Sequence, residues 1–147
     1  MENTCARVPF SWTVRVYFED TDAGGIVYYA NFLKFFERCR TEWLRALGVE
    51  QTRLAEQSGL QFVVARLAVD YFKPARLDDQ LTVTAAIGEP ARSYLVFEQR
   101  ALRGTELLAR ATVKIACVDI RRLAPARLPA DLVAAFQAAR DYQEPKP

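Results

Sequence analysis

One helical pattern constrains the fold more than any other feature of the sequence. From Asn31 onward, apolar residues recur at helical spacing and form one wide face. Asn31 is the expected N-cap, and Gly48 is the expected C-terminal stop. A helix with so many aromatic residues is predicted to pack against a sheet at the centre of the core. The apolar face consists of Phe32, Phe35, Phe36, Cys39, Trp43, Ala46 and Leu47, widened by Leu33 and Leu44.

Arg40 is the exception on this helix, because at 100° per residue it falls inside the apolar arc. A guanidinium at such a position is expected to have a buried or interfacial partner. Glu37, three residues earlier, is one candidate for that partner.

Strand-like patterns surround the helix. Residues 12–18 alternate, which places Trp12, Val14, Val16 and Phe18 on one face. A short helical segment (49–58) ends at Gly59. The remaining elements are expected strands at 60–72, 80–87, 93–102 and 107–120, and an expected helix at 129–140. Consecutive strands should pair antiparallel, giving an α+β fold with one sheet wrapped on a long central helix. Residues 1–147 are predicted to form a single domain, with a core at about 12–137 and a loose C-terminal tail.

Composition narrows the classes of protein. A net charge of +2 gives no reason to expect nucleic acid as a partner. The sequence shows no signal-peptide pattern and no transmembrane segment of ~20 apolar residues. Three cysteines (Cys5, Cys39 and Cys117) without metal-type spacing suit a reducing compartment, so a soluble cytoplasmic protein is expected. Cys39 and Cys117 are expected in the core.

The sequence contains no histidine. This excludes a Ser-His-Asp triad, a Cys-His pair and the usual histidine-based zinc sites. Acid–base chemistry would have to use carboxylates, Lys, Tyr, Cys or backbone groups.

The segment 19–31 is the candidate site. It carries the carboxylates Glu19, Asp20 and Asp22, then two glycines, then an apolar run into the helix start. A carboxylate beside a helix N-terminus can act as base or nucleophile while free N–H groups hold an oxygen that develops negative charge. Taken alone, Asp22 in this run is more typical of an ordinary turn residue than of a catalytic one. No metal is expected, since an EF-hand loop counted from Asp20 would place Asn31 where the bidentate Glu belongs.

Several stretches together carry a resemblance to a known family. They are residues 14–32 (VRVYFEDTDAGGIVYYANF), 36–42 (FERCRTE), 62–64 (FVV), 71–79 (YFKPARLDD) and 95–100 (LVFEQR). The chain resembles the hot-dog-fold acyl-CoA thioesterases of the 4-hydroxybenzoyl-CoA thioesterase type, and within them the YbgC-like subfamily associated with the Tol–Pal system. The similarity covers roughly residues 12 to 137.

The resemblance implies a hot-dog fold, in which an antiparallel sheet curls around the long helix. It also implies homodimers with a continuous sheet that commonly assemble into homotetramers, with active sites at the dimer interface. Asp22 matches the catalytic acid, as general base or nucleophile, while Asp20 and Glu19 are expected to be structural. The backbone N–H at Tyr29 matches the group that polarises the thioester carbonyl. Many relatives have His there, so the backbone contribution is expected to survive and the side-chain contribution is open.

Further site residues are expected from the same resemblance. Glu37 is a rival carboxylate, because other hot-dog thioesterases place the acid on the central helix, and Glu37 and Arg40 together are candidates to support the site. Residues expected to contact substrate are Gly25, Tyr28, Arg92 and Ser93. Lys114, Arg121 and Arg122 are additional candidates for the phosphates of coenzyme A.

The resemblance therefore predicts hydrolysis of an acyl-CoA to a carboxylic acid and free CoA, without metal or organic cofactor. The alternative is a module that binds an acyl thioester or an acyl carrier protein, or a partner of an envelope complex, with little turnover. Hot-dog dehydratases usually employ a histidine, which this chain lacks. The aromatic residues are compatible with aryl, short or long aliphatic acyl groups.

Overall fold

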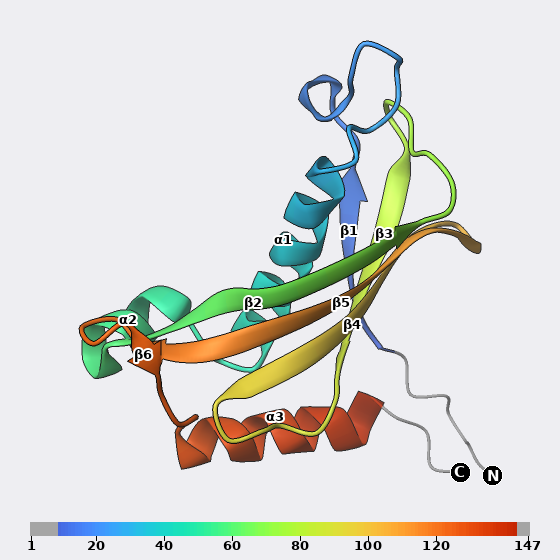
Figure 1. The fold of residues 1–147 in the computed structure, drawn as a ribbon. Coiled ribbons are helices and arrows are strands. Elements are labelled where there is room, and N and C mark those ends of the chain that lie inside the picture. Colours follow the sequence, from blue (N-terminus) through green and yellow to red (C-terminus); the bar gives the residue numbers. More distant parts are fainter. Residues whose placement is uncertain (1–8, 144–147) are drawn as a thin grey trace, which may run out of the picture.

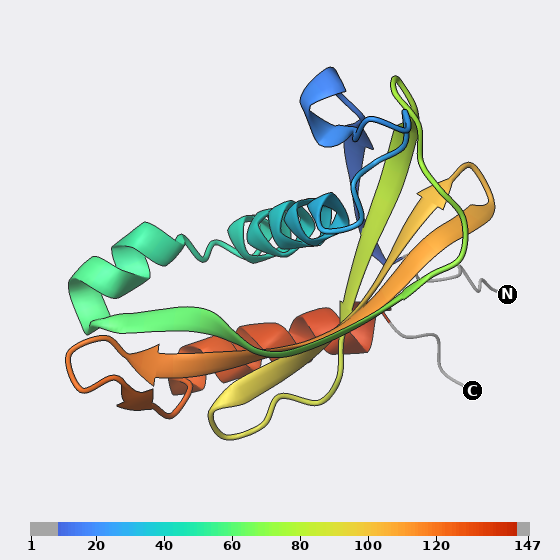
Figure 2. The same ribbon diagram turned by 45° about the horizontal axis from the view of Figure 1, so that its top comes forward.

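A single curled sheet holds one long helix on its concave face (Figure 1). The computed structural model describes residues 9–143. The sheet is antiparallel, in the order β1 (Phe10–Arg15), β3 (Gln80–Ile87), β4 (Tyr94–Arg103), β5 (Glu106–Asp119) and β2 (Leu60–Tyr71), with the short β6 (Ala124–Pro125) on β5. The helices are α1 (Asn31–Ala46), α2 (Gln51–Ser58) and α3 (Ala130–Gln143). Figure 2 shows α1 lying across the hollow of the sheet, which confirms the predicted α+β hot-dog arrangement.

The core forms where the apolar face of α1 meets alternating residues of β3, β4 and β5. All the predicted face residues from Phe32 to Leu44 except the half-buried Leu33 are buried, whereas Ala46 is exposed. The ring of Trp43 meets Phe97 of β4 edge-on, with centroids 5.1 Å apart, and stacks on Phe136 of α3 at 5.5 Å. Helix α3 therefore packs against the C-terminal end of α1 (Figure 1).

The predicted helix ends are only half correct. At the C-terminal end, Gly48 has φ +82° and Val49 N donates to Leu44 O (2.9 Å), so the glycine stop is confirmed. At the N-terminal end, the prediction that Asn31 is the N-cap is wrong. Asn31 is the first helical residue, and its side-chain Nδ2 donates back to Asp20 O (2.8 Å). The side chain therefore ties the preceding loop to the helix.

The first strand is displaced from its predicted range of 12–18. β1 ends at Arg15, and residues 18–20 form a short 3₁₀ helix, because Tyr17 N donates to the carboxylate of Asp20 (2.8 Å). Val14 and Val16 are buried as predicted, but the side chain of Phe18 is 81% exposed. The local hydrogen bond overrides the alternating pattern.

The pairing of consecutive strands holds for β3, β4 and β5 but is wrong for β2 and β3. β2 pairs with β5 at the far edge of the sheet, with Tyr71 opposite Ala109. Residues 72–79 then carry the chain across to β3 (Figure 1). β2 is consequently an edge strand, and the segment 72–79 is free to contact the loop before α1.

Arg40 finds its partner on the sheet. Its Nη1 donates to Gln99 Oε1 (2.9 Å), and Gln99 Nε2 donates to Phe36 O (3.0 Å). Both side chains are buried, and burial lowers the pKa of Arg40 while Glu37 opposes that shift. The expected pairing with Glu37 is wrong, because Glu37 accepts from Thr41 Oγ1 instead (2.8 Å).

Both described cysteines are free and buried, as predicted for core residues. Burial raises the pKa of Cys39 to about 12, against the opposing effect of Arg40 and Gln99, and raises the pKa of Cys117. Neither thiol is thus disposed to ionise. The expected helix at 129–140 is α3, which extends to Gln143, so residues 141–143 are helical rather than part of the predicted loose tail. Cys5 and the rest of that tail, residues 144–147, lie outside the described residues. Within residues 9–143, no helix is long and apolar enough to cross a membrane.

Replacing Gln99 by Leu should lower the free energy of unfolding by about 2 kcal/mol, because the buried guanidinium of Arg40 loses its acceptor. Urea unfolding followed by circular dichroism measures the change. Gln57→Leu, at an exposed position of α2, is the matched control and should change stability little. Equal effects in the two variants would contradict a stabilising role for the Arg40–Gln99 hydrogen bond.

Candidate active site

A tight turn presents Asp22 at the tip of the loop before α1. Asp22 N donates to Ile26 O (2.8 Å), and Gly25 N donates to Asp22 O (3.0 Å). Gly25 has φ +81°, a conformation that favours glycine. The turn is closed by a bridge between Thr21 and Val27. The Asp-Ala-Gly-Gly sequence thus fixes the backbone on both sides of Asp22.

The carboxylate of Asp22 is exposed. Its Oδ1 accepts from Gly24 N (2.8 Å), and a Cβ at position 24 would lie only 3.2 Å from that oxygen. No Lys or Arg of the described residues forms an ion pair with it. The group is held by one backbone contact and is open to solvent or a ligand.

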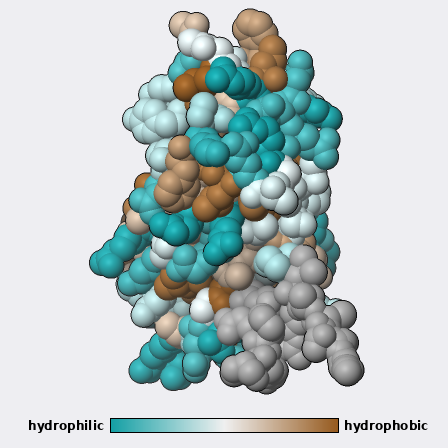
Figure 3. All heavy atoms as spheres, turned by 90° about the vertical axis from the view of Figure 1, so that its right-hand side faces the viewer, coloured by the Kyte–Doolittle hydropathy of each residue, from teal (hydrophilic) through white to brown (hydrophobic). Residues whose placement is uncertain are grey.

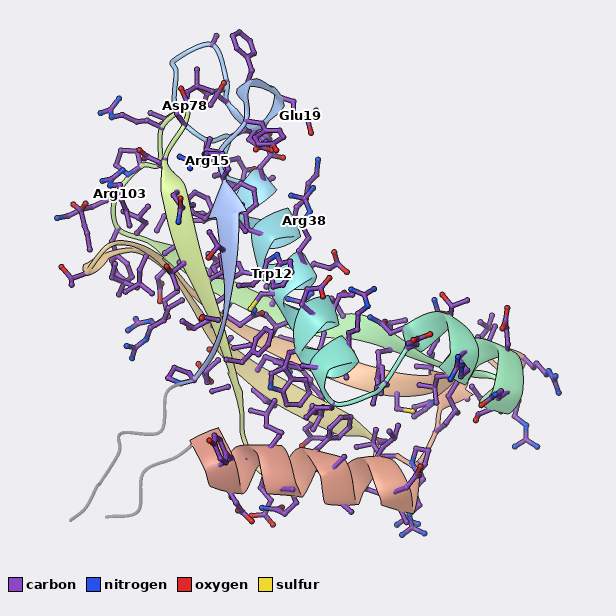
Figure 4. The ribbon with its side chains drawn as sticks, turned by 180° about the vertical axis from the view of Figure 1, so that it is seen from behind. Trp12, Arg15, Glu19, Arg38, Asp78 and Arg103 are labelled. Atoms are coloured by element: carbon purple, nitrogen blue, oxygen red, sulfur yellow. The ribbon has the colours of Figure 1, made fainter. Side chains whose placement is uncertain are left out.

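Asp20 is buried and shapes the loop. Its Oδ2 accepts from Tyr17 N, and its backbone oxygen accepts from Tyr28 N (3.0 Å) and from the side chain of Asn31 (2.8 Å). With all these contacts inside the loop, Asp20 has the structural part expected of it. Glu19 is exposed on the 3₁₀ helix that precedes Asp22, and it is labelled in Figure 4.

Free N–H groups stand at the start of α1. The N–H groups of Asn31, Phe32 and Leu33 bond to the carbonyls of Tyr28, Tyr29 and Ala30 (2.8, 3.3 and 3.1 Å). The N–H groups of Tyr29 and Ala30 have no partner among the described residues. Unpaired donors at a helix N-terminus can hold an oxygen that carries negative charge.

A groove of about 270 Å³ lies beside these donors. Tyr71, at the end of β2, donates its hydroxyl to Tyr29 O (2.9 Å), and burial raises its pKa, as does the neighbouring Tyr29. The ring of Tyr28 packs against the ring of Tyr29, with the ring centroids 4.9 Å apart. Tyr71 was not predicted from the sequence as a site residue, because its position depends on the pairing of β2 with β5. The lining residues are Ile26, Val27, Tyr29, Phe32, Tyr71, Phe72, Lys73 and Pro74.

The segment 72–79 is hydrogen-bonded to the loop that carries Asp22. Val27 N donates to Ala75 O (2.8 Å), and Ile26 pairs with Arg76 in a bridge. Two arginines hold this segment in turn: Arg15 Nη1 donates to Asp78 O (2.7 Å), and Arg103 on the β4–β5 hairpin donates to Asp79 Oδ2 (2.7 Å) (Figure 4). Neither arginine was identified from the sequence, since both contacts join residues more than 20 positions apart.

Arg103 belongs to a network of ion pairs. Its guanidinium also donates to Glu106 Oε1 (2.7 Å), and Lys73 pairs with Glu106 (2.9 Å). Partial burial alone would raise the pKa of Asp79, but Arg76 N–H and Arg103 hold it below its usual value. Lys73 and Arg103 likewise lower the pKa of Glu106.

Hydrophilic residues predominate on the side of the molecule in Figure 3, with apolar residues in separate patches.

The other predicted site residues lie elsewhere. Ser93 O accepts from Cys117 N (2.8 Å), and Cys117 pairs in register with Phe62. The ten residues from Phe62 to Tyr71 span roughly 30 Å of strand, so Arg92 and Ser93 are not brought to Tyr29 within one chain. Glu37 and Arg40 line a separate cavity of about 100 Å³ between α1, α2 and the sheet.

The basic residues considered for the coenzyme A phosphates are also remote from the loop. Lys114 lies over the ring of Tyr94, 4.2 Å from its centroid. Arg121 and Arg122 donate their backbone N–H groups to Asp119 Oδ1. Within residues 9–143, no three Asp, Glu or Cys side chains cluster in a way that could hold a metal ion.

An antiparallel sheet curled around one long helix is the hot-dog fold, and here the loop before the helix carries the exposed carboxylate of Asp22. The sequence profile of the thioesterase-like superfamily matches residues 16–136, and the chain belongs to this family of enzymes. It is 51% identical over 127 residues to the acyl-CoA thioesterase YbgC of Haemophilus influenzae, covering 86% of this chain and 93% of that one. The acyl-CoA thioester hydrolase YbgC of Escherichia coli O6:H1 is 44% identical over 129 residues, covering 87% and 96%.

A solved structure agrees with these relatives. The crystal structure of a probable thioesterase from Bartonella henselae superposes with a TM-score of 0.76 at 39% identity, covering 81% of this chain and 98% of that one. The predicted resemblance to YbgC-like thioesterases is therefore confirmed.

Replacing Arg103 by Met should lower the melting temperature by about 3 °C at neutral pH, because Asp79 and Glu106 lose a shared partner. Both carboxyls have folded-state pKa values below their unfolded values near 4. The stability they contribute is present above about pH 4 and is lost as pH falls through the folded pKa values. The difference between wild type and variant should therefore shrink towards pH 3.

Thermal melts followed by circular dichroism between roughly pH 3 and pH 8 measure this trend. Arg53→Met on α2 is the control, since Arg53 only approaches Glu50 at 3.9 Å on an exposed surface. A difference for Arg103→Met that did not vary with pH would contradict the role given to the carboxylates.

Proposed function

We propose that the protein hydrolyses acyl-CoA thioesters to a carboxylic acid and free CoA. Asp22 acts as general base or nucleophile, and the N–H of Tyr29 polarises the thioester carbonyl. One observation supports this most directly: among residues 9–143, an exposed carboxylate without a cationic partner stands on the loop that leads into N–H groups without a hydrogen-bond partner at the start of α1. The names of the relatives from Haemophilus influenzae and Escherichia coli, acyl-CoA thioesterase and acyl-CoA thioester hydrolase, agree with the substrate class.

The chemistry needs few groups. As general base, Asp22 takes a proton from water while the water oxygen attacks the carbonyl carbon, and the N–H of Tyr29 holds the developing oxyanion. The C–S bond then breaks, and the thiolate takes up the proton held by Asp22. As nucleophile, Asp22 would attack the carbonyl carbon and expel the thiolate of CoA, which gives a mixed anhydride. Water would then hydrolyse the anhydride to the carboxylic acid and the free Asp22 carboxylate, and the released proton would go to the thiolate. Tyr29 acts through its backbone, so a phenol can stand where many relatives have imidazole.

The groove beside Tyr29 is the proposed acyl-thioester channel. Its walls are largely apolar and aromatic, which suits the pantetheine arm or an acyl chain. Tyr28 and Gly25 lie at its mouth in this proposal, on the loop that carries Asp22.

We further propose that two chains pair through β2, as the first step of assembly towards the expected homotetramer. β2 is an edge strand with apolar side chains left exposed on it, including Val64 (52%) and Leu67 (40%). Antiparallel pairing of two such edges would bring the Leu60 end of one strand beside the Tyr71 end of the other. Arg92 and Ser93 of the second copy would then approach Tyr29 of the first and could bind coenzyme A.

The expected cytoplasmic location and association with the Tol–Pal system belong to the same proposal. A cytoplasmic enzyme would meet acyl-CoA where it is made, and acyl carrier protein is a second thioester source. Comparing acyl-CoA with acyl carrier protein thioesters as substrates separates the two.

Asp22→Asn should lower kcat/KM by at least about 100-fold, because the amide can neither accept the proton nor attack. A panel of aryl, short and long acyl-CoAs with thiol detection first identifies a substrate, which is then used for the variant. Asp78→Asn is the matched control: its backbone has φ +70°, which Asn tolerates, and its side chain lies on the neighbouring segment. Full activity of Asp22→Asn would refute the assignment of Asp22.

The same variant separates catalysis from a binding role. If the protein is an acyl-thioester binding module with little turnover, wild type will bind acyl-CoA in calorimetry but release no thiol above the rate of Asp22→Asn.

Leu67→Asp should shift the protein from dimer to monomer in analytical ultracentrifugation and lower kcat/KM, because a charge would enter the paired β2 edges. Leu123→Asp, at an 84% exposed position off this strand, is the control and should leave the mass unchanged. A wild-type protein that sediments as a monomer and is fully active would rule out assembly through β2 as a requirement.

A further inference from the structure

Tyr71 is distinguished by reaching the helix start from a remote strand. It is the last residue of β2, 42 positions after Tyr29 in sequence. Its hydroxyl donates to Tyr29 O at 2.9 Å, and its ring meets the rings of Tyr29 and Phe32 edge-on, with centroids 6.0 and 5.7 Å apart. The phenol is thus fixed at both its ring and its oxygen.

The carbonyl that Tyr71 binds belongs to a functionally placed peptide group. Tyr29 C=O and Ala30 N–H share one peptide plane, and Tyr29 N–H belongs to the same residue. These are the two N–H groups at the start of α1 that have no partner among the described residues. The competing contact to Tyr29 O, from Phe32 N, is longer, at 3.3 Å. The orientation of this peptide therefore depends strongly on the hydroxyl of Tyr71.

We infer that Tyr71 is a positioning residue for thioester hydrolysis, which holds the Tyr29–Ala30 peptide so that Ala30 N–H, next to Tyr29 N–H, meets the developing oxyanion. This inference rests on the proposed function. Donors for an oxyanion act through their fixed direction, and a small misplacement weakens them in the transition state more than in the bound substrate. The hydroxyl should therefore affect kcat rather than KM.

Tyr71→Phe tests this inference with little change in packing, because the ring and its contacts remain. We expect kcat to fall roughly tenfold, with KM within about twofold of wild type and an unchanged melting temperature. Tyr142→Phe, at a 75% exposed hydroxyl on α3, is the matched control and should match wild type in both constants.

A second readout does not depend on turnover. The amide resonance of Ala30 in a ¹H–¹⁵N spectrum should move in Tyr71→Phe and not in Tyr142→Phe, because Ala30 N–H shares its peptide with the Tyr29 carbonyl. An unchanged Ala30 resonance would overturn the inference by showing that the hydrogen bond is absent in solution.

The kinetic outcomes are equally decisive. An unchanged kcat in Tyr71→Phe would overturn the inference, and so would a loss confined to KM, which would indicate a substrate contact instead. Failure of the proposed function looks different: wild type itself would release no thiol from any acyl-CoA. An active wild type whose kcat falls in Tyr71→Phe, together with a shifted Ala30 resonance, supports the positioning role.

Discussion

Burial of the aromatic face of α1 against the curled sheet is the constraint on which the other features depend. Phe35, Phe36 and Cys39 have no exposed surface, so the helix cannot rotate or slide without opening the core. This packing fixes the N-terminal end of α1 beside the loop that carries Asp22. The same burial takes Arg40 out of water, and Gln99 compensates by linking the guanidinium to the backbone of the helix.

The two aspartates of the loop differ in environment rather than in chemistry. Asp20 is buried and its polar atoms are used by Tyr17, Tyr28 and Asn31, so it fixes the shape of the loop. The carboxylate of Asp22, two residues later, accepts one hydrogen bond from the described residues, from Gly24 N. A carboxylate that must accept a proton or attack a carbon needs unused oxygen lone pairs. In the proposed mechanism, the exposed carboxylate would take the part that an imidazole often has, since the chain contains no histidine.

Sequence patterns predicted what depends on neighbours along the chain. The ranges of β3, β4 and β5 and the glycine stops at Gly48 and Gly59 follow from local geometry, and each was predicted to within a residue or two. Predictions were wrong where a contact from elsewhere prevails. The side chain of Asn31 binds Asp20 O rather than capping the helix, and Arg40 pairs with Gln99, 59 residues away, rather than with Glu37. The segment 72–79, which braces the loop, could not be assigned before the partner of β2 was known.

The edge strand β2 links the sheet to the candidate site. One side of β2 pairs with β5, the other is open, and its last residue binds the carbonyl of Tyr29. An open edge with exposed apolar residues is unfavourable in water, and its pairing with a second strand would remove that exposure and restrain the strand. A restrained β2 holds Tyr71, and Tyr71 holds the peptide at the start of α1. Pairing of two chains through β2 would thus affect the site in two ways. It would bring Arg92 and Ser93 of the second copy to the site, and it would restrain the N–H donors at the start of α1 in the first copy.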